Sequence, residues 1–232
     1  MTRIVLGGCL VTVLTLAPAA ISGQATPPQQ GTAKTAPLLY DRVKAAGSHL
    51  DEALDAGDVP VANLAELGSR ASVVVVGRIL GTRSRLAADQ QHVTTEVAVH
   101  VQESLKGPVV LGSVIYCRVP GGAHRFADGR TARQTAPGFR MPRPRATYVL
   151  FLQPIRPGVS GIVGRGAQAP RGPERADYEL ATGLQGQFEL QFERGTVVPA
   201  PGGKDHPLAV RYADMPVTDF LAELHRTVGR RR

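Results

Sequence analysis

The stretch HVTTEVAVHVQESLKG, residues 92–107, constrains the fold more than any other part of the chain. Small apolar residues and threonine alternate there with larger or more polar residues. The two series are Val93, Thr95, Val97, Val99 and Val101 on one side, and Glu96, Ala98, His100 and Gln102 on the other. Side chains of a β-strand point alternately to the two faces of a sheet. The stretch therefore predicts a long strand with one face in a hydrophobic core.

Other segments predict further strands of the same sheet. ASVVVVGRIL, residues 71–80, is an apolar, β-branched run typical of a strand that is buried on both faces. VVLGSVIYCRVPGG, residues 109–122, alternates and ends in a Pro-Gly-Gly turn signal. TYVLFLQP, residues 147–154, and GIVGRGAQ, residues 161–168, predict two short strands. We therefore expect a fold that consists mainly of β-structure.

The stretch QGQFELQFERGTVVPA, residues 185–200, predicts a β-hairpin whose two-residue turn is Arg194 and Gly195. Its first strand alternates aromatic or aliphatic residues with glutamine and glutamate. The expected inward residues are Phe188, Leu190 and Phe192, and the expected outward residues are Gln187, Glu189, Gln191 and Glu193.

Helical periodicity appears only near the two ends of the chain. Leu39, Val43, Ala46, Leu50 and Ala53 recur at spacings of three and four, which predicts a helix that ends near Gly57. A second short helix is expected around residues 61–70. At the C-terminal end, an apolar face formed by Val217, Phe220, Leu221, Leu224 and Val228 predicts an amphipathic helix with Thr218 as its N-cap.

These elements predict an α+β fold that is mainly β: a small OB-like barrel, closed or partly open, with N-terminal helices and a C-terminal helix. The succession of strands at residues 71–79, 93–107, 112–122 and 145–154, with Leu105-Lys106-Gly107, resembles secreted bacterial proteins related to netrin-like domains and tissue inhibitors of metalloproteinases. The resemblance implies an OB-type barrel over residues 71–191. Those inhibitors act through an N-terminal cysteine and disulfide-bonded loops, so the resemblance assigns no inhibitory residue to this chain.

The first 25 residues have the order of a secretory signal peptide: one arginine, an apolar run from Ile4 to Leu16, then small residues up to Ala25. Cleavage near Ala25 is expected, with Ala19 as the alternative site. A rival interpretation takes residues 6–9 as a lipoprotein signal ending at Cys9, but this would leave most of the apolar run on the mature protein. We therefore expect a secreted or periplasmic protein.

The predicted organisation divides the chain into five parts. These are a signal peptide at 1–25, a flexible linker at 26–37, a helical preface at 38–70, a barrel domain at 71–200 with a long Arg-rich loop at 121–146, and a loop with a C-terminal amphipathic helix at 201–232.

Cys117 is the cysteine that stays after removal of the signal peptide, so no intramolecular disulfide is expected. It shares its side of the strand with Ile115 and Val119, which predicts a small apolar core residue. His124 follows seven positions later, and a thiol hydrolase that uses the two residues is the remote alternative. We favour the core interpretation because the sequence shows no group to orient the histidine.

Motifs of other catalytic and metal sites are missing from the sequence. It contains no G-x-S-x-G, H-E-x-x-H or P-loop, and His92 and His100 would lie roughly 26 Å apart on an extended strand. Asp205 and His206 offer two ligands of an incomplete metal site, for which an ordinary loop is the favoured interpretation. We therefore predict a non-enzymatic protein with no catalytic residue, metal or cofactor.

The segment at 121–146 is the strongest candidate for binding. The chain carries a formal net charge of +8, and residues 118–175 hold eleven arginines against Asp128 and Glu174. An arginine-rich composition encoded by a GC-rich genome is the alternative explanation. The candidate residues are Arg125, Phe126, Arg130, Arg133, Phe139, Arg140, Arg143 and Arg145.

The favoured function is a binding domain that recognises a protein partner through this loop and an adjoining barrel edge. The alternative is a module that binds a polyanion or an anionic glycan of the cell envelope, because arginine and aromatic side chains hold such polymers by charge and stacking. No nucleic-acid partner is expected for a secreted protein. The sequence does not determine the oligomeric state.

Overall fold

The computed structural model describes residues 37–54, 60–155, 176–200 and 206–229, which belong to one compact unit. The expected signal peptide, Cys9, the strand at 161–168 and Asp205 lie outside the described residues. The helices are α1 (Leu39–Ala45), α2 (Leu64–Arg70), α3 (Pro207–Tyr212) and α4 (Val217–Val228). The strands are β1 (His49–Ala53), β2 (Val73–Leu86), β3 (Val93–Lys106), β4 (Val114–Pro120), β5 (Gly122–Arg125), β6 (Thr131–Thr135), β7 (Thr147–Pro154), β8 (Tyr178–Leu180), β9 (Gln187–Gln191) and β10 (Thr196–Pro199).

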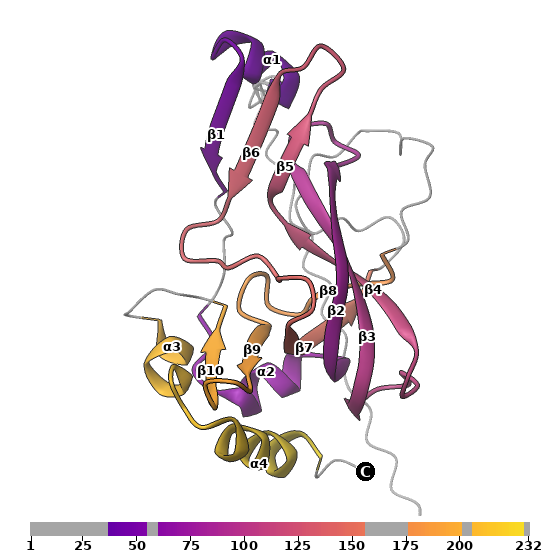
Figure 1. The fold of residues 1–232 in the computed structure, drawn as a ribbon, viewed down its shortest axis with the longest axis vertical. Coiled ribbons are helices and arrows are strands. Elements are labelled where there is room, and N and C mark those ends of the chain that lie inside the picture. Colours follow the sequence, from indigo (N-terminus) through magenta and orange to yellow (C-terminus); the bar gives the residue numbers. More distant parts are fainter. Residues whose placement is uncertain (1–36, 55–59, 156–175, 201–205, 230–232) are drawn as a thin grey trace, which may run out of the picture. The chain divides into compact units, whose positions relative to one another are not determined.

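The larger sheet forms a partly closed barrel (Figure 1). Its strand order is β10-β9-β7-β2-β3-β4-β8, and β8 also pairs with β7, so β2, β3, β4, β8 and β7 complete a ring. The parallel pairing of β4 with β8 contains only two residue pairs, which leaves the ring weakly closed there. A partly open ring of five strands is the architecture of OB barrels. The expected mainly β, α+β barrel fold is confirmed.

The long strand β2 is buried on both faces, as its apolar run predicts. Val73, Val75 and Ile79 pack in the barrel interior with valines of β3, whereas Val74 and Val76 face a second core that contains Phe151. The pairing of β2 with β3 shifts register at three places, and such bulges bend a strand so that a sheet can curve. β2 thereby belongs to the barrel and also supports the layer of helices outside it.

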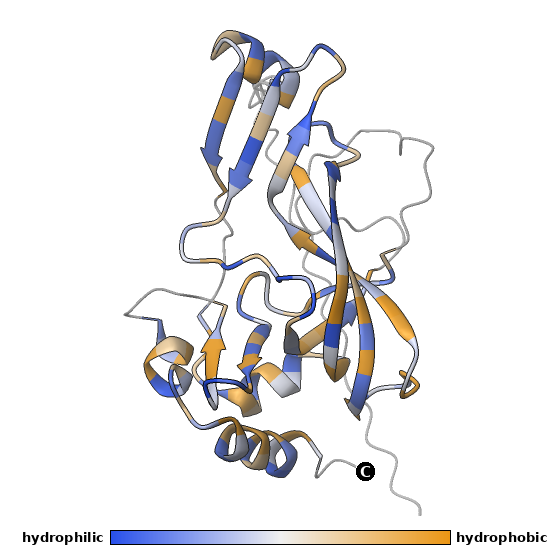
Figure 2. Cartoon of the chain, in the orientation of Figure 1, coloured by the Kyte–Doolittle hydropathy of each residue, from blue (hydrophilic) through white to orange (hydrophobic). Residues whose placement is uncertain are grey.

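The alternation along β3 is confirmed. The residues of its inward series are all buried: Val93, Thr95, Val97, Val99 and Val101. Figure 2 shows the resulting change between hydrophobic and hydrophilic residues along this strand. The next strand begins later than its sequence pattern predicts: β4 starts at Val114, and Val110 and Leu111 lie exposed in the connection.

The helix at the C-terminal end is confirmed as α4, which buries Val217, Phe220, Leu224 and Val228. Its N-cap is Pro216 instead of Thr218. The sequence patterns did not predict α3, which begins with a proline after the N-cap residue His206. The α2 helix ends at Arg70 as expected and starts at Leu64. Tyr212 joins α3 to its neighbours, because its hydroxyl accepts a hydrogen bond from the Leu64 amide and donates one to Glu223.

The long helix expected between Leu39 and Gly57 is wrong. The α1 helix ends at Ala45, Gly47 takes a φ of 102°, and His49–Ala53 forms β1. This strand pairs in parallel with β6, and Leu50 packs against the small core that holds Leu39. Pairing with a distant strand therefore outweighs the local helical period, which depended on alanines at two of its five positions.

The expected loop at 121–146 is also wrong in its first half. β5 and β6 form an antiparallel hairpin, and β6 lies between β5 and β1 in a three-stranded sheet. The TARQT sequence of β6 buries Ala132 and Gln134. The buried Gln134 amide accepts a hydrogen bond from the Val93 amide and donates one to Glu52. A strand whose buried positions are alanine and glutamine has no hydrophobic alternation to reveal it.

The hairpin at 185–200 is confirmed as β9 and β10, but the expected two-residue turn at Arg194 and Gly195 is wrong, because four residues connect the strands. Its inward and outward assignments are also partly wrong. Phe188 and Leu190 are buried, whereas Phe192 is 61% exposed in a four-residue connection. Gln187 and Glu189, expected outward, are buried. They are covered because the segment after Ala136 lies over this face of β9. The Gln187 amide donates a hydrogen bond to the Arg140 carbonyl oxygen, and Arg143 pairs with Glu189.

Candidate functional site

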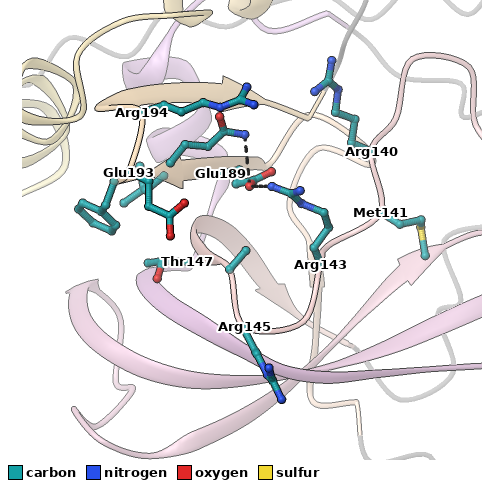
Figure 3. A pocket seen from close by; sticks show the side chains of 12 residues that line it. Arg140, Met141, Arg143, Arg145, Thr147, Glu189, Glu193 and Arg194 are labelled. Atoms are coloured by element: carbon teal, nitrogen blue, oxygen red, sulfur yellow. Dashed lines mark hydrogen bonds and ion pairs between the residues drawn. The ribbon is translucent and has the colours of Figure 1, made fainter.

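An open groove lies between the irregular segment at 140–147 and the end of β9 with the connection that follows it (Figure 3). Its volume is about 690 Å³. The lining residues are Arg140, Met141, Arg143, Arg145, Ala146, Thr147, Glu189, Leu190, Gln191, Phe192, Glu193 and Arg194. Four of them are arginines and two are glutamates, so the lining carries a net positive charge. We call this site the arginine groove.

The backbone that carries two of these arginines is fixed by hydrogen bonds. The Arg140 carbonyl oxygen accepts a bond of 2.6 Å from the side-chain amide of the buried Gln187. The Arg145 amide donates to the Ile79 carbonyl oxygen at 2.8 Å, and its own carbonyl oxygen accepts from Arg78 at 3.3 Å. Arg145 also has a φ of 69°, a left-handed conformation that costs free energy for a residue other than glycine. The groove wall is thus an ordered segment.

Arg143 is the groove arginine that forms an internal ion pair. Its guanidinium group donates to the carboxylate of Glu189, whose side chain is only 9% exposed, and this hydrogen bond raises the pKa of Arg143. The Tyr148 hydroxyl accepts a hydrogen bond from the Arg143 amide at 3.0 Å and donates to Glu189 at 3.4 Å. Burial raises the pKa of the Tyr148 hydroxyl, which keeps it protonated as a donor. Arg143 thereby compensates the negative charge of the nearly buried Glu189.

The other three groove arginines are available to a ligand. The guanidinium groups of Arg140, Arg145 and Arg194 form no ion pair with any residue that the structure describes. Figure 3 shows the four arginine side chains spread along the groove and pointing in different directions. The exposed Phe192 ring also lines the groove. An extended anionic ligand fits this arrangement better than a single small ion does.

The structure places the eight predicted site residues in three different surroundings. Arg140, Arg143 and Arg145 line the groove. The residues that belong to the β5–β6 hairpin and do not line it are Arg125, Phe126, Arg130 and Arg133. Phe139 packs half-buried against the barrel core. The eight residues therefore do not lie together on one loop, and their role in binding stays a prediction.

In the hairpin, Phe126 and Arg130 hold the structure together, whereas Arg125 and Arg133 are exposed. The Phe126 ring lies edge-on to Tyr40, with ring centres 5.2 Å apart, and to His124 at 4.8 Å. Arg130 pairs with Asp128 and donates to the Gly47 carbonyl oxygen at 2.9 Å. Asp128 also accepts a hydrogen bond from the Tyr40 hydroxyl. These contacts attach the hairpin turn to α1 and the residues after it.

Cys117 is a core residue, as predicted. It is fully buried among the valines of the barrel interior, and burial raises the pKa of its thiol to about 12. A nucleophilic cysteine needs an accessible thiolate. His124 contacts Phe126 instead, and partial burial lowers the pKa of its imidazole. The pair therefore does not have the geometry or the ionisation of a thiol hydrolase.

His206, considered above with Asp205, accepts a hydrogen bond from the Leu208 amide and is bonded to Gln185 at 3.0 Å, so it serves as a cap. Within the described ranges, no group of three or more histidine, cysteine, aspartate or glutamate side chains is placed to hold a metal ion. Over the same residues, none of the helices has the length and hydrophobicity needed to cross a membrane.

Comparisons of the chain with protein-family models, with curated proteins and with solved structures found no match. The resemblance to netrin-like barrels therefore stays a prediction from the strand pattern.

Sequence reasoning missed the second wall of the groove. The sequence predicts a tight turn at Arg194 and a core position for Phe192. It predicts an outer strand face for Glu189, Gln191 and Glu193. The exposure of Phe192 follows from the four-residue connection between β9 and β10. The available signal was the sequence Phe192-Glu193-Arg194 just before Gly195. These charged and aromatic residues lie at a hairpin turn, which places side chains at the surface.

Proposed function

We propose that the chain is a binding domain that holds an anionic ligand in the arginine groove. The observation that carries this proposal is that Arg140, Arg145 and Arg194 line one open groove and form no ion pair with any described residue. Guanidinium groups donate in a fixed, planar geometry that matches carboxylate and phosphate oxygens. Because hydrogen bonds fix the backbone of the wall, little backbone ordering is needed on binding. The signal-like order of residues 1–25 supports a site of action outside the cytoplasm.

The expectation of a protein partner loses its main support, because the two phenylalanines on which it depended are half-buried. A different observation favours a protein as the second candidate. Val110 and Leu111 are adjacent, 70% and 67% exposed, at the tip of the β3–β4 connection. Exposed apolar patches often mark contacts with other proteins. Binding at this tip should survive moderate salt and should be lost on Leu111→Ser.

A titration with a fluorescent polyanion, dextran sulfate, tests the proposed function. The variant R140A/R194A removes two groove charges, and the control R125A/R133A removes two exposed charges of the hairpin. We expect the groove variant to weaken binding about tenfold, with little change in the control. Binding should also weaken as salt is added. An equal loss in both variants would show that net charge, rather than the groove, attracts the polyanion.

A further inference from the structure

We infer that the ligand of the arginine groove is an acidic glycan, a chain of sugars that carry carboxylate groups. This inference rests on the proposed function and names the ligand class of the same site. It follows from the groove residues that are not arginines, since these distinguish one polyanion from another.

The carboxylates of the groove argue against a densely charged polymer. Glu189 and Glu193 both line the groove, and among the residues that the structure describes only Glu189 forms an ion pair with an arginine. A nucleic-acid strand carries one negative charge about every 3.4 Å. Inorganic polyphosphate carries a comparable density of charge. Either polymer would bring several charges close to Glu193, and like charges at short distance repel. An acidic glycan carries one carboxylate per acidic sugar, so its charges can meet the arginines while neutral parts lie against the glutamates.

Hydrogen-bond chemistry points the same way. Glu189 and Gln191 lie on one face of β9, where the Gln191 side-chain amide donates to Glu189 at 3.4 Å. Glu193 follows in the connection to β10, and Thr147 lies on the neighbouring strand β7. Ionised carboxylates only accept hydrogen bonds, whereas amides and hydroxyls both donate and accept. Phosphate and phosphodiester groups offer acceptors alone, so they cannot satisfy Glu193 if they displace its water. Sugar hydroxyls donate and accept, and therefore match this lining.

Phe192 adds an apolar surface at the groove. Its ring is 61% exposed although it neighbours a well-packed strand. An aromatic ring can stack on the apolar face of a sugar, where C–H groups point outward, and the contact excludes water from both surfaces. Polyphosphate has no such face. The combination of an exposed ring, hydroxyl partners and separated arginines therefore fits an acidic sugar chain.

An acidic peptide is the competing ligand, and the outer edge of β10, the strand that follows the groove residues in the chain, does not favour it. Extended peptides commonly bind by adding a strand to a free sheet edge. The outer edge of β10 is already occupied, because the Val197 amide donates to the Met215 carbonyl oxygen at 2.9 Å and the Asp214 amide donates to the Val197 carbonyl oxygen at 3.1 Å. The groove thus offers mainly side chains.

The test compares an oligogalacturonate, a polyphosphate and an oligoglutamate peptide that carry equal numbers of charges. Each is titrated calorimetrically into the full mature protein and its variants. We expect the oligogalacturonate to bind about tenfold more tightly than the other two. Q191A and F192A should each weaken its binding about fivefold while leaving polyphosphate binding unchanged, because these residues contact hydroxyls and sugar faces. R140A/R194A should weaken every probe that binds in the groove.

Two results would overturn the inference, and they are distinguishable. If polyphosphate or the peptide binds more tightly and depends on Arg140 and Arg194, the ligand class is wrong while the proposed function stands. If no probe responds to R140A/R194A, the proposed function fails as well. Both Gln191 and Phe192 are at least partly exposed, so Q191A and F192A should fold, and unchanged thermal unfolding verifies this.

Discussion

The two halves of the segment at 121–146 have similar compositions and different roles. In the first half, the β5–β6 hairpin, Arg130 is bonded to Asp128 and to the Gly47 carbonyl oxygen, and Phe126 packs against Tyr40. In the second half, Arg140 and Arg145 form no ion pair with any described residue and line an open groove. Arginine content alone therefore does not identify a binding site. Arg130 and Arg143 hold the fold because a carboxylate lies within reach, whereas Arg140 and Arg145 have no such partner among the described residues.

The halves also differ in what fixes their backbones. β5 and β6 are fixed by pairing in a sheet, so their side chains alternate between the core and solvent. The segment at 140–147 is fixed by separate hydrogen bonds, such as those from Gln187 to Arg140 and from Arg145 to Ile79. Such an irregular segment does not alternate its side chains strictly between two faces, so Arg140, Arg143 and Arg145 can all line one groove.

Gly122→Ala should have the largest effect on stability. The substitution should act on the β5–β6 hairpin and not on the arginine groove. Gly122 begins β5 with a φ of 129°, and a Cβ atom there would overlap the hydroxyl oxygens of Ser84 and Thr95. We expect the free energy of unfolding to fall by about 2–4 kcal/mol, measured by urea denaturation.

Gly112→Ala is the matched control for this change. Gly112 also has a left-handed φ, of 79°, but a Cβ atom there would meet nothing within 4 Å. It should cost only about 1 kcal/mol, the conformational penalty alone. Equal losses in the two variants would contradict the close packing of the hairpin on the barrel.

Arg143→Ala should have the next largest effect, because Arg143 is the groove arginine that resembles Arg130 in having a carboxylate partner. Its removal leaves the nearly buried Glu189 without a cation, and we expect a loss of about 1–3 kcal/mol in thermal or urea unfolding. The double variant R143A/E189Q should be more stable than R143A, since it removes the uncompensated charge. A double variant that is less stable than R143A would contradict the compensating role of this pair.

Asp128 should make the stability of the β5–β6 hairpin weakly sensitive to acid. Hydrogen bonding by the Arg130 amide, followed by the Tyr40 and Arg130 side chains, lowers the pKa of Asp128 from its ordinary value of 3.8. A lowered pKa in the folded state means that the carboxylate contributes stability above pH 3.8, and that this contribution is lost as the pH falls through the folded pKa. The effect is small because the group is exposed.

The melting temperatures of the wild-type protein and Asp128→Asn, measured against pH, check this expectation. The wild-type protein should be slightly more stable near neutral pH, and the difference should disappear in acid. A difference that persists unchanged at the lowest pH would show that the charge of Asp128 is irrelevant. In the same scan, the melting temperature of the groove variant R140A/R194A should depend on pH in the same way as that of the wild-type protein.

The barrel was predictable because its strands carry a strong two-residue period. Val93 to Val101 and Ile115 to Val119 reveal their buried faces directly, and the burial of Cys117 follows from its position between two apolar neighbours. β1 and β6 were not predictable in the same way. The buried positions of β6 are an alanine and a glutamine, and the stability of both strands comes from pairing with each other across the sequence.

The site was predictable only in part, because it joins segments that are far apart in the sequence. Arg140, Arg143 and Arg145 were recognised from their local density. Glu189 pairs with Arg143 across 46 positions, and no local pattern indicates such a contact. Gln187 and Glu189 looked like outward residues because alternation cannot show that a second layer covers them.

The most direct measurement is a map of backbone amide chemical shifts in the wild-type protein as the oligogalacturonate is added. Ligand binding in the arginine groove predicts that the largest changes occur at residues 140–147 and 189–195, with little change along the hairpin at 122–135. Largest changes in the hairpin, or small changes spread evenly over the arginines of the surface, would contradict the assignment of the second half to binding.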